Sequence, residues 1–291
     1  MKNLINQLLR GVVIGVANII PGVSGGTMMV SMGVYDTLIH CITHLFKEFK
    51  KSVKTLLPYA IGMLVGIVAL ASVINWGLEN QPLPTNALFI GLILGGLRPL
   101  LSKVNVKKIN APAVMAFVLL FALIVWMGFQ RKDSIQNAET IRMDAGQVLL
   151  MVAIGMVASA TMIIPGVSGS LVLMLLGYYK PVVNALSTLK DAALHADLSL
   201  LGQPLLMLVP FLIGIVLGIF GVAKAIEWLT ARFPTPTYCG VLGLVVASPV
   251  SLLIQQDFSA VSTVTVLLSA AAFAVGFAVA MLLDRGVKAD A

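Results

Sequence analysis

The sequence predicts an all-α integral membrane protein built from two repeats of inverted topology, and three observations lead to this fold class. The 291 residues are 59% hydrophobic and only 11% charged, whereas a soluble domain carries about 25% charged residues. Several apolar stretches approach the roughly 20 residues that a membrane-spanning helix needs. The heptapeptide Ile19-Ile20-Pro21-Gly22-Val23-Ser24-Gly25 also returns unchanged at residues 163–169, a shift of 144 positions.

Each copy of the heptapeptide interrupts an apolar stretch. Proline removes a backbone donor and breaks a helix, and glycine lets the chain turn sharply. Backbone N–H groups then remain unpaired where the next helix begins. Within a bilayer such a break is tolerated only where it is buried in protein or lines a water-filled cavity. Each copy is therefore a candidate site, with expected hairpin tips near residues 21–26 and 165–170.

The first half, residues 1–140, begins with the first broken segment. In residues 36–54, apolar residues recur at helical spacing and lysines gather on the other side. This pattern predicts a helix that lies in the membrane interface. The apolar stretches that follow predict membrane spans at residues 56–76, 85–101 and 111–129.

The second half, residues 141–291, repeats this order. Beyond its break the shift becomes 152 positions, because eight residues are inserted in the connecting segment. At that shift the matching pairs include Pro58 with Pro210, Gly62 with Gly214, Trp76 with Trp228, and Gly91 with Gly243. Such self-similarity indicates an internal repeat, which is common in secondary transporters. The spans predicted here are residues 204–226, 238–254 and 264–283.

The distribution of Lys and Arg predicts how the chain is oriented. If each broken segment returns to its own side, each half crosses the bilayer three times and the second half is inverted. The inside then holds 14 of the 19 basic residues; if each broken segment crossed once, the inside would hold 9. Because basic residues gather in cytoplasmic loops, we expect each broken segment to return to its own side, with both termini cytoplasmic. A full hairpin that crosses the bilayer twice would give the same count. The 12 residues from Ser24 to Tyr35 and from Ser168 to Tyr179 span only about 18 Å of helix, so we expect re-entrant hairpins that enter from opposite faces and meet near the midplane.

The same rule explains the formal net charge of +7. In a soluble protein this surplus would suggest nucleic acid, but here loop lysines account for it, and we expect no nucleic-acid partner.

The hairpin tips carry groups that bind anions. Unpaired N–H groups, a helix dipole and small hydroxyl side chains converge after each break, and no Gly-Lys-Ser/Thr follows that would make a Walker loop. The alternative is that small residues merely let the tips pack closely. Two inverted copies meeting at the midplane match the layout of transporter sites. The substrate-binding residues that we expect at the tips are Asn18, Gly22, Ser24, Gly25, Gly26, Thr27, Gly166, Ser168, Gly169 and Ser170.

Four other residues are expected near the transport path. Arg98 lies near the inner end of a span, where it either binds phosphate as a further substrate ligand or extends its side chain to the interface. Tyr35, Asp36 and Tyr178 follow the two breaks and are candidates for coupling or gating. Coupling to a proton or another ion is left open by the sequence, as is the oligomeric state.

No cofactor, metal or enzymatic activity is expected. His40, His44 and His195 stand isolated on amphipathic helices, and the chain carries no zinc motif. One alternative is a membrane polyprenyl-pyrophosphate phosphatase with Ser24 or Ser168 as nucleophile. Neither hairpin supplies the Glu or His that such chemistry requires. The other alternative is a transporter or channel for a small soluble anion.

The run from Asn18 to Thr27, followed by Gly33-Val34-Tyr35-Asp36, resembles the signature of the PopT family of polyprenyl-phosphate transporters. Residues 163–170 with Gly177-Tyr178 resemble that family's second copy, and Asp36 stands where the family commonly has Glu. The resemblance covers nearly the whole chain. It implies a flippase of the bacterial cytoplasmic membrane that recycles undecaprenyl phosphate, the lipid carrier of cell-wall synthesis, by alternating access. The residues themselves predict an anion, and the lipid follows from the resemblance.

Overall fold

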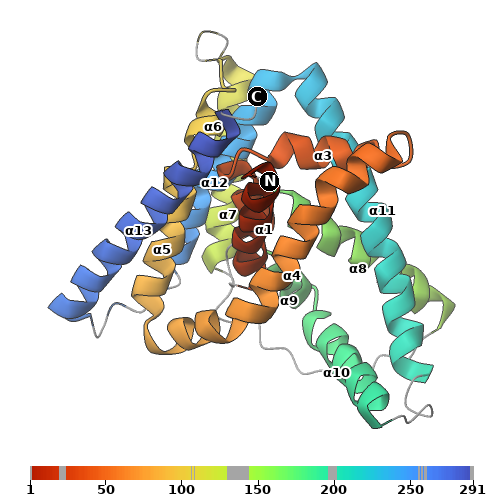
Figure 1. Cartoon of the computed structure of the whole chain (residues 1–291). Helices are drawn as coiled ribbons and strands as arrows, with labels where there is room; N and C mark the ends of the chain where they lie inside the picture. The colour runs from red at the N-terminus through yellow and green to blue at the C-terminus, as the bar shows by residue number, and fades with distance from the viewer. Residues whose placement is uncertain are drawn as a thin grey trace.

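The computed structural model describes residues 2–19, 24–105, 107, 109–129, 144–195, 202–254, 256, 258 and 261–288. Within these ranges helices are the only regular secondary structure (Figure 1), in agreement with the predicted all-α class. The helices are α1 (Lys2–Ile19), α2 (Gly25–Ser31), α3 (Tyr35–Thr43), α4 (Phe49–Asn80), α5 (Pro82–Gly95), α6 (Arg98–Leu101), α7 (Ala111–Phe129), α8 (Ala145–Ile163), α9 (Gly169–Leu175), α10 (Tyr179–His195), α11 (Gly202–Arg232), α12 (Pro234–Ile254) and α13 (Thr263–Lys288).

Seven segments of the described chain are long and apolar enough to cross a membrane. They are Phe49–Leu70, Pro82–Leu101, Ala111–Phe129, Gly146–Ile163, Pro204–Arg232, Pro234–Ile254 and Thr263–Leu283. Large apolar side chains remain exposed along several of them, and Trp76, Trp126 and Trp228 are each more than half exposed. Exposed apolar surface on this scale is stable in lipid rather than in water, so the chain is a multi-pass membrane protein.

The long helices pack in pairs. Helix α1 lies along α4 and α8 lies along α11, while α5 packs against α13 and α7 against α12. Glycine allows the close approach in the first two pairs, as is usual between membrane helices. A Cβ atom at Gly62 of α4 would overlap the carbonyl oxygen of Leu8, and one at Gly214 of α11 would overlap that of Val152.

The short helix α2 lies inside this framework rather than against lipid. Six of its seven residues are buried, and it contacts α1, α5, α6, α8 and α12. A helix start needs partners for its free N–H groups, and protein surrounds this one. The start of α2 therefore meets the condition under which interrupted helices occur at membrane depth.

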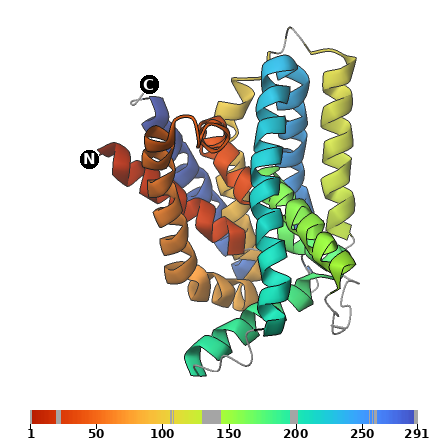
Figure 2. The same cartoon turned by 90° about the vertical axis from the view of Figure 1, so that its right-hand side faces the viewer.

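Helices α3 and α10, which follow the short helices α2 and α9, lie at opposite ends of the molecule. Figures 1 and 2 place α3 toward one end and α10 at the other. The beginning of α1, helix α6 and the end of α13 lie toward the α3 end, and the end of α7 and the beginning of α8 lie toward the α10 end (Figure 2).

Two predicted helices differ in the structure. The interfacial helix expected at residues 36–54 is interrupted: α3 ends at Thr43, and the chain turns before α4 begins at Phe49. The backbone N–H of Glu48 closes this turn by donating to the carbonyl of His44 at 2.8 Å. Tertiary packing decides the break, because α3 buries its apolar side against the core while α4 turns away to lie along α1.

The span expected at residues 85–101 also divides. Helix α5 ends at Gly95, and α6 covers Arg98–Leu101. Pro99 cannot donate the backbone hydrogen bond that would continue α5. At Gly96 a Cβ atom would overlap the backbone of Ser31. The end of α2 therefore packs against the backbone at the point where α5 ends.

Candidate functional site

The first tip is organised by Ser24, which caps α2. Its backbone is extended, and its hydroxyl accepts a hydrogen bond from the N–H of Gly26 at 3.1 Å. A serine in this position satisfies one of the free donors of a helix start. Ser24, Gly25, Gly26 and Thr27 are all buried. The expected site residue Gly22 lies outside the described residues.

The second tip turns at Gly166, whose φ is +82°. This left-handed conformation suits glycine because it has no Cβ, and a Cβ atom here would also lie 2.6 Å from the carbonyl oxygen of Leu244. Ser168 follows, buried, at the position before the first residue of α9. Gly169 begins α9, and the side chain of Ser170 lies outside the described part of the structure.

The two tips meet. The hydroxyl of Thr27 accepts a hydrogen bond from the backbone N–H of Gly166 at 2.6 Å, across 139 positions of sequence. Ser24 donates to the carbonyl of Ile164 at 3.4 Å, and a Cβ atom at Gly26 would lie 2.7 Å from the carbonyl oxygen of Ile163. Ser24 and Thr27 of the first tip therefore share one buried centre with residues 163–166 of the second, and both hydroxyls bond to the backbone of the second tip.

Among the described residues, two expected site residues form no side-chain hydrogen bond with the opposite tip. The amide of Asn18 donates to the carbonyl of Ile14, one turn back in its own helix, at 3.0 Å. Asn18 does lie against the first tip, because a Cβ atom at Gly25 would lie 2.7 Å from its amide. Arg98 is exposed on α6, and within the described residues its side chain forms no hydrogen bond or ion pair.

The remaining expected residues separate to the two ends of the molecule. Tyr178 precedes α10 and packs with a cluster formed by α8 and α11 that includes Met151 and Phe211. Tyr35 and Asp36 begin α3, at the opposite end (Figure 1), and both line a pocket. The residues lining that pocket are Val30, Gly33, Tyr35, Asp36, Pro99, Leu100, Lys103, Tyr238 and Val241.

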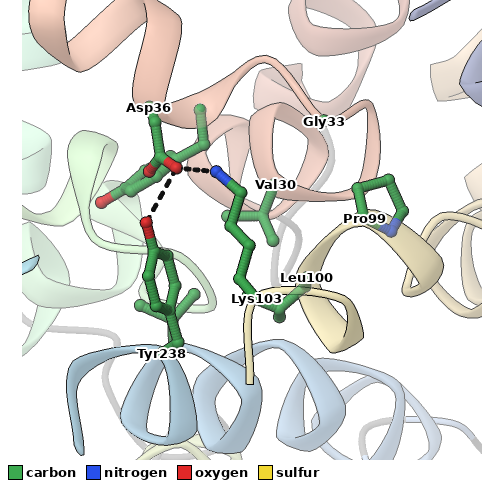
Figure 3. A pocket seen from close by; sticks show the side chains of 9 residues that line it. Val30, Gly33, Asp36, Pro99, Leu100, Lys103 and Tyr238 are labelled. Atoms are coloured by element: carbon green, nitrogen blue, oxygen red, sulfur yellow. Dashed lines mark hydrogen bonds and ion pairs between the residues drawn. The ribbon is translucent and has the colours of Figure 1, made fainter. Parts of the chain in front are cut away.

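The pocket brings together charged and polar groups from three separate segments (Figure 3). The carboxylate of Asp36 pairs with the ammonium of Lys103 and accepts a hydrogen bond from the hydroxyl of Tyr238 at 3.0 Å. Lys103 Nζ also lies 5.4 Å from the centre of the Tyr238 ring, within range of a cation–π interaction. The pocket thus contains one positive charge, on Lys103, and one negative charge, on Asp36, that balances it.

The hydroxyl of Tyr35 lines the same pocket, is buried, and has no hydrogen-bond partner among the described residues. Burial raises the pKa of Tyr35, and the charge of Asp36 adds to the effect. Its phenol therefore remains a neutral donor.

Lys103 and Tyr238 were not among the residues expected from the sequence. Lys103 belongs to a basic loop that orientation rules already explain, and Tyr238 lies 202 positions from Asp36. The predicted topology is the signal that could have brought them together. It places the loop at residues 102–110 and the start of the span at residue 238 on the same side of the membrane. Tyrosine at the start of a span is expected at the interface.

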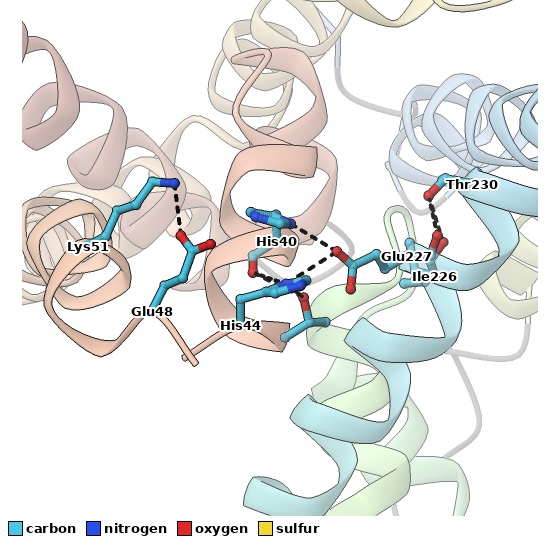
Figure 4. A network of polar contacts seen from close by, with 8 residues as sticks. His40, His44, Glu48, Lys51, Ile226, Glu227 and Thr230 are labelled. Atoms are coloured by element: carbon cyan, nitrogen blue, oxygen red, sulfur yellow. Dashed lines mark hydrogen bonds and ion pairs between the residues drawn. The ribbon is translucent and has the colours of Figure 1, made fainter. Parts of the chain in front are cut away.

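The expectation that the histidines are isolated is wrong for two of them. His40 of α3 and His44, the next residue after α3, both approach Glu227 of α11, at 2.9 Å and 3.5 Å from its carboxylate (Figure 4). Contacts between helices so far apart in sequence cannot be read from the periodicity of either one.

Ser24 is one of the two candidate nucleophiles of the phosphatase alternative, and within the described residues its hydroxyl has no base among its hydrogen-bond partners. The hydroxyl of Ser24 bonds to backbone groups, namely the N–H of Gly26 and the carbonyl of Ile164. Within the described residues neither bond involves a histidine or a carboxylate, whereas an activated nucleophile needs such a base within hydrogen-bond reach.

Comparison with known proteins agrees with the resemblance in the sequence. The undecaprenyl phosphate translocase-like family model matches residues 14–266 and 201–285. The chain is 29% identical over 283 residues to a polyprenyl-phosphate transporter of Staphylococcus aureus, covering 96% of this chain and 95% of that one. It is 27% identical over 260 residues to a polyprenyl-phosphate transporter of Vibrio cholerae, covering 84% and 76%.

No solved structure matches the chain. Both relatives carry the name of a transporter rather than an enzyme, in agreement with the expectation of no enzymatic activity. The family model covers most of the sequence and includes both breaks. The protein therefore belongs to the undecaprenyl phosphate translocase-like family.

Proposed function

We propose that this protein is a flippase that returns undecaprenyl phosphate across the bacterial cytoplasmic membrane, with the phosphate headgroup passing between the two hairpin tips. The observation that carries the proposal is the buried hydrogen bond between Thr27 and Gly166. It joins two identical Pro-Gly breaks inside an apolar helical protein. Donors at two opposed breaks are what a transporter needs to hold an anionic headgroup at membrane depth.

The two halves form an inverted repeat, each with a re-entrant hairpin and three crossings. Matching positions support this arrangement. Gly33 and Gly177, 144 positions apart, both have positive φ values, of 67° and 79°, where the chain leaves α2 and α9. Gly62 and Gly214, 152 positions apart, both admit a neighbouring helix backbone. The opposite placement of α3 and α10 (Figure 2) is the placement that an inverted pair requires.

Both termini and α3 face the cytoplasm in this proposal. The basis is the excess of Lys and Arg on that side, 14 of 19, since positive residues remain inside. The pocket of Asp36, Lys103 and Tyr238 then opens at the cytoplasmic end, where a headgroup arriving from the outer leaflet leaves the protein.

The headgroup binds when the tips separate. In the present arrangement Ser24, Thr27 and the Gly166 N–H satisfy one another or the opposite backbone. Separation frees these groups, and a phosphate inserted between them restores the lost hydrogen bonds. The helices after the breaks have seven residues each, so hydroxyl and N–H donors contribute more than the helix dipole, whose charge grows with aligned peptides.

Lys103 supplies the next attractive charge on the cytoplasmic side. A phosphate monoester carries about −1.5 to −2 charges near neutral pH, more than the single charge of Asp36. The headgroup therefore competes for Lys103, while Tyr35 and Tyr238 offer hydroxyl donors. Asp36 acts as a gate in this scheme, because it holds Lys103 between transport cycles. Arg98 contributes no contact to the tips or to this pocket and instead remains at the interface.

The test uses Ser24→Ala, Ser168→Ala and Thr27→Val in proteoliposomes that contain undecaprenyl phosphate. A hydrogen bond to a charged group contributes about 1.5–3 kcal/mol, so losing one donor should slow transport roughly tenfold or more. The control is Ser159→Ala, because this serine is fully buried but bonds only to the carbonyl of Met156 in its own helix.

The measurement follows lipid phosphate that an impermeant phosphatase, added outside the liposomes, removes over time. Normal transport by all three tip variants would show that the tips are packing elements and that the headgroup binds elsewhere. Release of phosphate from a pyrophosphate lipid by the protein itself would favour the phosphatase alternative.

A further inference from the structure

Two histidines and a carboxylate from opposite halves of the chain converge near the α3 end of the molecule (Figure 4). His40 lies in the last turn of α3, His44 is the residue directly after the end of α3, and Glu227 lies near the end of α11. One oxygen of Glu227 lies 2.9 Å from His40 Nδ1 and 3.5 Å from His44 Nδ1. All three donor atoms lie within 4.8 Å of one another.

We propose that His40, His44 and Glu227 form a binding site for a divalent transition-metal ion such as Zn²⁺. Histidines at positions i and i+4 point from the same face of a helix, which is a recurrent arrangement for two zinc ligands. Imidazole favours Zn²⁺, Cu²⁺ and Ni²⁺, whereas Mg²⁺ and Ca²⁺ prefer oxygen ligands throughout. Two histidines with one carboxylate therefore select a transition metal.

The distances fit such an ion. Zinc binds nitrogen and carboxylate oxygen at about 2.0–2.2 Å with tetrahedral angles, which puts neighbouring ligand atoms about 3.3 Å apart. The observed separations of 2.9 Å and 3.5 Å lie on either side of that value. Small side-chain rotations are enough to form the site, with the metal taking the place of the contact between His40 and Glu227.

Neighbouring groups orient the ligands. The hydroxyl of Thr43 donates to the carbonyl of His40 at 3.0 Å and lies 3.0 Å from His44 Nδ1. The rings of His40 and His44 stack with centres 4.1 Å apart. Side chains held in place before the metal arrives lose little conformational freedom when it binds.

Solvent reaches the cluster. The side chains are 50% exposed for His40, 29% for His44 and 32% for Glu227. An ion can therefore enter without unfolding the protein, and water can take the fourth position that three protein ligands leave open.

A metal at this place would connect the two halves of the protein. Helix α3 follows the first tip helix, and α11 belongs to the second half; the two helices pack against each other. If the halves move during transport, a consequence that rests on the proposed function, a bound metal holds them together and slows the cycle.

The binding test uses the full-length protein in lipid nanodiscs, carrying a tag without histidine and treated with a chelator. Zn²⁺ is titrated in competition with a chromogenic chelator. We expect one ion per chain, and Co²⁺ should give the visible absorption of a tetrahedral site. Even an outer contact of a metal site contributes about 10–100-fold to affinity, so His44→Ala and Glu227→Gln should each weaken binding at least about tenfold. The control is His195→Ala, which removes the remaining histidine of the chain.

Equal zinc affinity in the wild type, His44→Ala and Glu227→Gln would overturn the proposal, as would an equal loss in His195→Ala. Gel filtration of each variant separates a lost ligand from a misfolded protein. Transport measured with and without Zn²⁺ then tests the consequence: zinc should slow the wild type and leave His44→Ala unaffected. If none of the proteins transports lipid, the proposed function fails, and the binding result stands independently.

Discussion

At the scale of single residues, the ion pair of Lys103 with Asp36 is expected to contribute little to stability and much to transport. Both side chains are partly exposed, 42% for Lys103 and 36% for Asp36. An ion pair so exposed contributes about 0–1 kcal/mol to stability, because water and salt screen it. In the proposed function, the place of this ion pair in the pocket is therefore better explained by substrate than by folding.

We expect Lys103→Met to reduce undecaprenyl phosphate transport several-fold and to leave the thermal unfolding temperature nearly unchanged. The substitution keeps the length of the side chain but removes the cation that the phosphate needs. Lys107→Met is the matched control, since Lys107 lies in the same loop, is exposed and is absent from the pocket lining. Equal transport by the two variants would exclude Lys103 from the headgroup path.

At the scale of elements, the helix pairs depend on backbone contact at matching glycines. Helices α1 and α4 touch at Gly62, and α8 and α11 touch at Gly214. Lipid is as apolar as these helices, so the pairs are stabilised by close packing rather than by removal of apolar surface from water. A single methyl group at either position separates the backbones.

We therefore expect Gly62→Ala and Gly214→Ala each to lower the thermal stability of the detergent-solubilised protein. Overpacking of a close contact costs about 1–3 kcal/mol. The control is Gly221→Ala in α11, because nothing lies within 4 Å of a Cβ atom there, and alanine favours a helix. The interpretation fails if the three variants unfold at the same temperature.

At the scale of the whole molecule, the proposed inverted arrangement predicts which loops share a side of the membrane. In the structure, α6 and the beginning of α1 lie toward one end, and the end of α7 lies toward the other (Figure 2). Ser102 follows α6, and Ser134 belongs to the connection after α7, outside the described residues. The charge distribution places Ser102 inside and Ser134 outside.

Cysteines introduced at Ser102 and Ser134 should therefore differ in their reaction with an impermeant maleimide that is added to intact cells. We expect reaction at residue 134 and protection at residue 102 until the cells are lysed. The native Cys41 and Cys239 are buried and are replaced by serine to remove background. Labelling of residue 102 without residue 134 in intact cells would contradict the orientation.

Much of the architecture could be predicted because membrane helices obey one-dimensional rules. Apolar length identifies spans, and α7 coincides with the expected range of residues 111–129. The two breaks, the helix starts at Gly25 and Gly169 and the family all followed from a repeated heptapeptide. Proline and glycine act on their own backbone, so their effect is visible without knowledge of distant residues.

Contacts between distant segments needed the tertiary structure. The sequence placed hydroxyl groups at both tips, but packing determined that Thr27 accepts from Gly166 and that Asn18 bonds to its own helix. Packing also ended α3 at Thr43 and brought Glu227 to His40. Each of these contacts depends on distance and direction in space, and helical periodicity determines which face a side chain occupies without determining which helix lies opposite.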